Sequence, residues 1–97
     1  MNELSSNELL IEGKWISSGN KVTCDEACER IEWLVSEVLN KIGTDESGWE
    51  TLFQDPKDKR FWVLFYPQSE LHGGGPPSLR LITEDEAELK FNARKNT

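Results

Sequence analysis

A run of six apolar and aromatic residues, Phe61–Tyr66 (FWVLFY), constrains the fold of this chain more than any other feature. It lacks the alternation of apolar and polar residues that marks a strand with one solvated face. Such a run is typical of a central strand buried on both faces. Trp49–Gln54 precedes it with a period of two, and residues 55–58 (DPKD) between them have the composition of a tight turn. We therefore expect a hairpin at the centre of a sheet.

Further strands are expected on both sides of this hairpin. Residues 9–16 (LLIEGKWI) are apolar enough for a strand, with Gly13 as a possible bulge, and Lys21–Thr23 can pair back briefly after a turn. Residues 78–82 form another strand after the loop Gln68–Pro77.

Two helices are predicted from capping boxes, in which a threonine hydroxyl and a glutamate three residues later satisfy free amides. Thr23 with Glu26 starts a long helix from about Cys24 to Ile42, and Gly43 suits the left-handed position at its end. Thr83 with Glu86 starts a short helix that continues to about Phe91.

These elements predict one α+β domain over residues 1–97, because the length suits a single domain. It has a mostly antiparallel sheet of about four strands, one long helix across a face and a short C-terminal helix. The polar ends, residues 1–8 and 92–97, are expected to be loosely held.

The net charge is −7, from 18 acidic and 11 basic residues. Nucleic-acid binding draws its affinity from neutralising phosphates, so this charge disfavours direct binding to nucleic acid and favours basic protein partners. On charge alone, however, an acidic surface that serves only solubility is the favoured interpretation. No apolar run approaches the length of a membrane span, and the N-terminal residues do not resemble a secretory signal, so we expect a cytoplasmic protein.

The only cysteines, Cys24 and Cys28, would lie one turn apart on the predicted helix, where a disulfide is strained. We expect reduced, partly buried thiols. A zinc site would lack two ligands, because His72 is the only histidine, and no cofactor motif or calcium loop occurs.

The loop Glu70–Pro77 holds His72, three glycines and two prolines. It lacks the lysine and Ser/Thr of a phosphate-binding loop, and no nucleophile elbow is present to complete a catalytic triad. A rigid structural turn is the favoured interpretation, and the chain is not expected to be an enzyme. The alternative is a small enzyme or ligand-binding domain that uses this loop, with His72 as acid and base.

One face of the predicted long helix is a candidate binding surface. Trp33 lies opposite the apolar stripe, where a large aromatic side chain can anchor an interface. The alternative is that a loop or the N-terminal residues cover it. The predicted partner-binding residues comprise Trp33, the helix carboxylates and a second acidic edge: Glu26, Glu29, Trp33, Glu37, Asp45, Glu46 and Glu50.

The segment GWETLFQDPKDKRFWVLFYPQSELHGGGPPSLRLIT, together with GKWISSGNKV and CERIEWLVSEVL, resembles the immunity protein 27 family of bacterial polymorphic toxin systems. The resemblance extends from about Leu10 to Glu86. It implies a cytoplasmic antidote that binds and neutralises a cognate toxin domain, typically the C-terminal domain of a contact-dependent or Rhs-type effector. It implies no catalytic residue, cofactor or metal.

Together with the acidic charge, the resemblance favours an immunity protein that occludes the active site or substrate groove of a toxin, with a basic nuclease as the expected target. A generic acidic adaptor module is the remaining interpretation from the residues alone.

Overall fold

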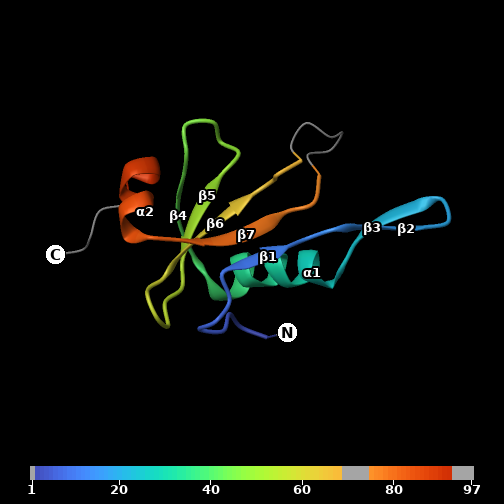
Figure 1. The fold of residues 1–97 in the computed structure, drawn as a ribbon, viewed down its shortest axis with the longest axis horizontal. Helices are drawn as coiled ribbons and strands as arrows, with labels where there is room; N and C mark the ends of the chain where they lie inside the picture. Colours follow the sequence, from blue (N-terminus) through green and yellow to red (C-terminus); the bar gives the residue numbers. More distant parts are fainter. Residues whose placement is uncertain (1, 69–74, 93–97) are drawn as a thin grey trace.

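The chain folds around a five-stranded antiparallel sheet (Figure 1). The structure is a computed structural model, and it describes residues 2–68 and 75–92. From edge to edge, the strands are β1 (Leu10–Glu12), β7 (Ser78–Ile82), β6 (Phe61–Phe65), β5 (Thr51–Gln54) and β4 (Asn40–Thr44). The α+β class and the antiparallel sheet are confirmed, with five strands in place of about four.

Strand β6 lies at the centre of this sheet, as its continuous apolar sequence predicts. It pairs with β5 on one side and with β7 on the other. Trp62 and Val63 point to opposite faces because side chains alternate along a strand, and both are fully buried. The sheet therefore has an apolar core on each face.

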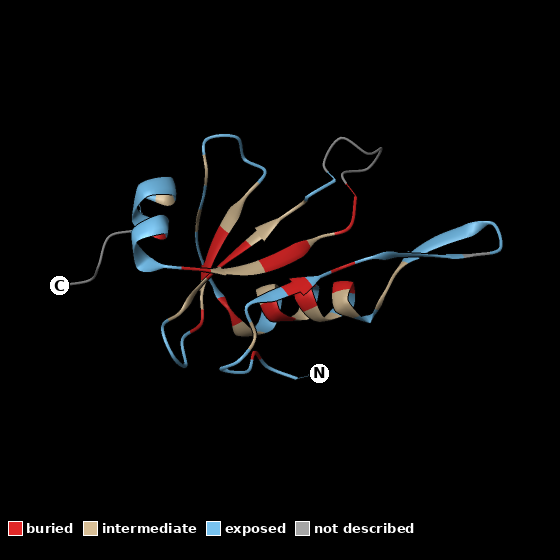
Figure 2. Ribbon diagram, in the orientation of Figure 1, coloured by how far each residue is buried: buried red, intermediate tan, exposed pale blue. Residues whose placement is uncertain are grey.

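The two helices cover these two faces. Helix α1 (Glu26–Trp33) packs on the face that carries Trp62, and helix α2 (Glu84–Phe91) packs through Ala87 on the face that carries Val63. Figure 2 shows the buried residues along the sheet and on the side of α1 that meets it. The larger core includes Ile11, Ile31, Leu34, Leu39, Phe53, Trp62 and Leu79, and the smaller one Leu52, Val63, Ile82 and Ala87.

The predicted long helix is wrong in its extent. Helix α1 continues only through a π-helical segment, η1 (Leu34–Val38), in which the Leu39 amide donates to the Leu34 carbonyl at 2.7 Å. Leu39 is then extended and buried, and the next residues form β4. Because Asn40–Thr44 (NKIGT) contains weak helix formers, pairing with β5 prevails over continuation of the helix.

The start of α1 also differs from the prediction. Asp25, not Thr23, is the N-cap residue, and its carboxylate accepts from the Cys28 amide at 3.0 Å and from the Lys14 amide at 3.2 Å. Thr23 instead belongs to strand β3 (Lys21–Cys24). For α2 the predicted cap is confirmed, because the Thr83 hydroxyl accepts from the Glu86 amide at 3.1 Å.

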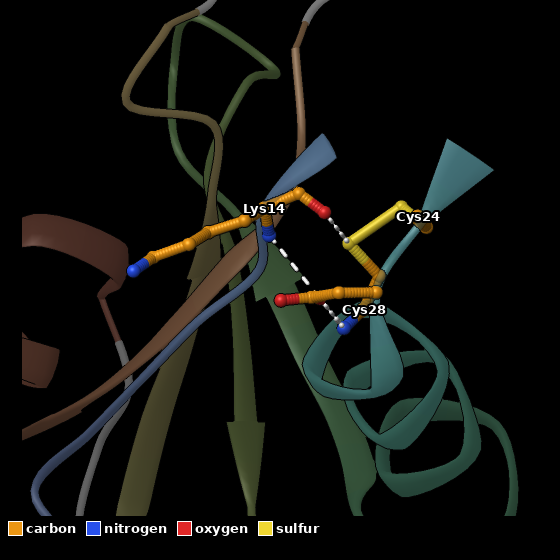
Figure 3. The surroundings of a disulfide bond; sticks show 4 residues. Lys14, Cys24 and Cys28 are labelled. Carbon is orange, nitrogen blue, oxygen red and sulfur yellow. Dashed lines mark hydrogen bonds between the residues drawn. A yellow bond between two sulfur atoms is a disulfide. The ribbon is translucent and has the colours of Figure 1, made fainter. Parts of the chain in front are cut away.

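Strands β2 (Trp15–Ser18) and β3 form a separate hairpin, here called the arm, which extends away from the sheet (Figure 1). A disulfide joins Cys24, at the end of the arm, to Cys28 on α1 (Figure 3). The expectation of reduced thiols is therefore wrong. Its premise fails because Cys24 precedes the helix, and the two Cα atoms lie 5.5 Å apart, within the usual range for a disulfide.

Gly13 sits where the chain leaves β1 and enters the arm. Its amide donates to the Pro77 carbonyl at 2.9 Å. A Cβ atom at this position would lie 2.5 Å from that oxygen and 2.7 Å from the Cys28 sulfur. The close approach of three chain segments at the base of the arm therefore requires glycine.

We predict that Gly13→Ala lowers the free energy of unfolding by about 1–3 kcal/mol, because the methyl group forces the backbone of residue 77 or the buried sulfur to move. Gly43→Ala is the matched control, since no atom lies within 4 Å of its Cβ position. Denaturant titration measures both, and equal stabilities of the two variants would contradict the packing described for Gly13.

Candidate functional site

The outer side of α1 and η1 carries four exposed carboxylates, here called the α1 acidic surface: Glu26, Glu29, Glu32 and Glu37. Three of them were predicted from the sequence, and Glu32 was not. No hydrogen bond or ion pair joins any of the four to another residue of the described chain. With 100° per residue, Glu26, Glu29 and Glu32 follow one side of the helix, so their charges act together.

Trp33 is partly covered, which supports the second of the two interpretations given for it from the sequence. It is half-buried and packs against the core cluster that includes Leu4 of the N-terminal segment (residues 2–8). Much of its aromatic surface therefore contributes to folding. The groups that the α1 acidic surface exposes to a partner are mainly carboxylates.

The N-terminal segment is held beside this surface by Arg30 of α1. The guanidinium donates to both carboxylate oxygens of Glu8, at 2.6 and 2.7 Å, and to the carbonyls of Asn2 and Glu3, both at 2.9 Å. The carbonyl of Ser5 accepts from Arg60 at 3.0 Å. The polar composition that predicts a loose segment did not reveal these contacts.

The hydrogen bonds from Arg30 lower the pKa of Glu8 from 4.5 to about 2, against the opposing effect of burial. Both partners are therefore charged at neutral pH and neutralise each other. Arg30, the basic residue of the last turn of α1, consequently leaves the negative potential of the neighbouring carboxylates uncompensated.

The second predicted acidic group, Asp45, Glu46 and Glu50, lies in and beside the β4–β5 loop. Asp45 accepts from the Ser47 hydroxyl at 2.8 Å and from the amides of Gly48 and Glu50, and the first of these bonds is the main cause of its lowered pKa. Glu50 forms an ion pair with Lys90 of α2. Two of the three carboxylates are therefore structural, and only Glu46 is unpaired within the described chain.

The structure does not join the two acidic groups into one surface. Glu50 reaches α2, which packs on one face of the sheet, whereas Glu26 and Glu29 belong to α1 on the other face. Glu26 and Glu29 instead share an open pocket of 760 Å³ with the N-terminal segment.

A third feature is a groove of 310 Å³ between the base of the arm, α1 and the end of β6, here called the aromatic groove. Its rings come from Trp15 and Tyr66, and Glu32 is its carboxylate. The Tyr66 ring is held by an edge contact with Trp49, with centroids 6.3 Å apart. Its apolar lining includes Ile31, Val35 and Leu64.

Sequence reasoning missed this groove because its residues are far apart in the chain. Trp15 begins strand β2 of the arm, whereas Tyr66 follows strand β6 of the larger sheet, and only the folded arm brings them to one pocket. The sequence carries little signal for the groove, because Trp15 and Val22 share a face of the arm only through the register of the hairpin.

The described residues include no candidate metal centre, and they do not include most of the glycine loop. Within residues 2–68 and 75–92, no group of three or more His, Cys, Asp or Glu side chains could hold a metal ion. Glu70 and His72, named in the alternative catalytic interpretation, lie outside the described residues. Neither helix of the described chain is long and apolar enough to cross a membrane.

These features define an acidic α+β domain whose exposed chemistry suits contact with another macromolecule. The family model of Immunity protein 27 matches residues 17–83, more than half of the chain. The chain therefore belongs to the Immunity protein 27 family, as the sequence resemblance indicated. Comparison with curated proteins and with solved structures gave no match. Membership implies an immunity role, exercised by binding a toxin protein.

The Arg30–Glu8 pair gives a pH-dependent prediction. The pKa of Glu8 is lower in the folded protein, so the pair stabilises fully above about pH 4.5, and this contribution is lost as the pH falls toward about 2. At pH 7, Glu8→Gln should lower the free energy of unfolding by about 1–3 kcal/mol.

Chemical denaturation of both proteins between pH 7 and pH 2 measures this effect, and the difference between them should shrink across that range. Glu3→Gln is the control, because Glu3 is exposed and its side chain only approaches Lys57 at 4.0 Å. A Glu8→Gln difference that stays constant with pH would contradict the assignment.

Proposed function

We propose that this protein is a cytoplasmic antidote that binds the C-terminal domain of one cognate toxin and occludes its active site or substrate groove. The single observation that carries the proposal is the match to Immunity protein 27 over residues 17–83. An inhibitor of this kind acts by binding alone, which agrees with the expectation that the chain is not an enzyme.

A basic nuclease is the proposed class of toxin. Its substrate-binding surface must be positive to hold phosphates, and the immunity protein carries a net charge of −7. The α1 acidic surface can pair with the lysines and arginines that otherwise hold nucleic acid. Its carboxylates have no competing partner in the described chain, so binding breaks no internal ion pair there.

Of the predicted interface residues, the main contact in this proposal is made by Glu26, Glu29 and Glu37, with the half-buried Trp33 among them on the same side of the helix. The loop residues Asp45 and Glu50 are less suited to this role, because each already has a structural partner. Glu46 remains the one loop carboxylate that can reach a toxin on that side.

A cytoplasmic location implies that Cys24 and Cys28 are reduced in the cell, since disulfides are rare in that compartment. Cys24 and Cys28 are only four positions apart, so the loop that they close is short, and its reduction would release little of the chain.

Co-expression tests the proposal directly. The toxin domain encoded next to this gene should co-purify with the protein and should lose its toxicity when the two are expressed together. Growth arrest that persists, combined with an absence of binding at low salt, would contradict the proposed function.

Charge reversal tests the surface. We predict that the pair Glu26→Lys and Glu29→Lys slows association with the toxin by about tenfold or more at low salt, because long-range attraction steers the encounter. The effect should weaken as added salt screens the charges. Stopped-flow or surface-based kinetics measures the association rate.

The matched control is the pair Glu46→Lys and Glu88→Lys, which makes the same change in net charge at exposed, unpaired positions by the β4–β5 loop and α2. It should slow association by less than about threefold. A larger effect for the control pair than for the α1 pair would move the interface to the loop.

A further inference from the structure

We propose that the aromatic groove is a receptor for one arginine side chain of the toxin. This inference rests on the proposed function for the identity of the partner, but the recognition chemistry belongs to the groove itself. Three side chains carry it: Trp15, Glu32 and Tyr66, which line the same pocket of 310 Å³.

The groove combines the groups that recognise a guanidinium. Aromatic faces attract a cation through their quadrupole, and a carboxylate takes paired hydrogen bonds from the planar guanidinium. Glu32 makes no hydrogen bond or ion pair with other residues of the described chain, so its charge is available. None of the described residues that line the groove is basic.

The remaining lining suits the stem of the same side chain. Ile31, Val35 and Leu64 form apolar walls against which three methylene groups can pack while the charged end meets Glu32. The volume is at the lower end of the range for ligand pockets, which fits a single side chain better than a larger ligand. Arginine is favoured over lysine, because its flat head both stacks on rings and binds a carboxylate with two bonds.

The arm offers a surface for the toxin residues on either side of that arginine. In the β2–β3 ladder, Trp15 lies opposite Cys24 and Ser17 opposite Val22, so these residues share one face of the arm. Trp15 is 42% exposed and Val22 60% exposed. The apolar face of the arm therefore continues from the groove outward, and a partner anchored in the groove can lie along it.

The α1 acidic surface adjoins this site through Glu32, which belongs to both. A basic partner drawn to α1 by its charge therefore meets the groove at the edge of the same surface. The carboxylates would set the rate of encounter, and the arginine in the groove would slow dissociation.

The first experiment needs no toxin. The isotope-labelled full chain is titrated with N-acetyl-arginine amide, and with N-acetyl-citrulline amide as a neutral compound of nearly the same shape. We expect saturable NMR shifts at the Trp15 indole and the Glu32 amide, with a Kd for the arginine compound below about 50 mM. Citrulline should bind at least about fivefold more weakly, and Glu32→Gln should remove this difference.

The absence of saturable shifts at these positions, or equal binding of the two compounds, would overturn the inference. Glu32→Gln is expected to fold, because Glu32 is exposed and unpaired. The Trp15→Ala variant of the second experiment is also expected to fold, because Trp15 is partly exposed on the arm. Glu88→Gln is the control for loss of one exposed carboxylate elsewhere, and it should leave the arginine titration unchanged.

The second experiment uses the toxin. Glu32→Gln and Trp15→Ala should each speed dissociation of the toxin by about tenfold. The double variant should speed dissociation by less than the product of the two single effects, because both residues contact the same arginine. Binding that is unaffected by either substitution would overturn the inference. If the toxin does not bind the wild type, the proposed function fails, and the arginine titration still decides the chemistry of the groove.

Discussion

The burial of β6 on both faces is the constraint on which the rest of the structure depends. Trp62 and Val63 are neighbours in sequence, yet each is fully buried in a different core, so the sheet needs a helix on either side. The helices α1 and α2 therefore lie on opposite faces of the sheet. This arrangement separates the α1 acidic surface from the acidic residues of the β4–β5 loop, a separation that the sequence alone did not predict. The side of α1 that faces away from the sheet is left exposed, and it carries the α1 acidic surface.

The base of the arm is the second decisive point. Gly13, the Asp25 cap and the Cys24–Cys28 bridge bring β1, the arm and α1 to one place. Figure 3 shows the bridge and Lys14 at this junction. Since an isolated two-stranded hairpin is barely stable in water, these fixed contacts are what allow the arm to extend from the body. The same contacts hold Trp15 across from Tyr66 and so create the aromatic groove.

Much of the sheet could be predicted from local pattern, because Phe61–Phe65, its preceding turn and the Thr83 cap are specified by neighbouring residues. The end of α1 could not, because Asn40–Thr44 becomes a strand only when β5 is beside it. Helix periodicity predicted three of the four exposed carboxylates of the α1 acidic surface and missed Glu32. The half-burial of Trp33, the Arg30 contacts with the N-terminal segment and the groove all depend on residues distant in sequence.

The carboxylates of this chain divide into those that hold the fold, such as Glu8, Asp25, Asp45 and Glu50, and those that the described structure leaves unpaired on α1. The central proposal is that the unpaired ones meet the toxin. Carbodiimide labelling of surface carboxylates, with and without bound toxin, tests it most directly. Protection of Glu26, Glu29 and Glu37, with unchanged labelling of Glu46 and Glu88, is the predicted result. Protection confined to Glu46 and Glu88 would contradict it.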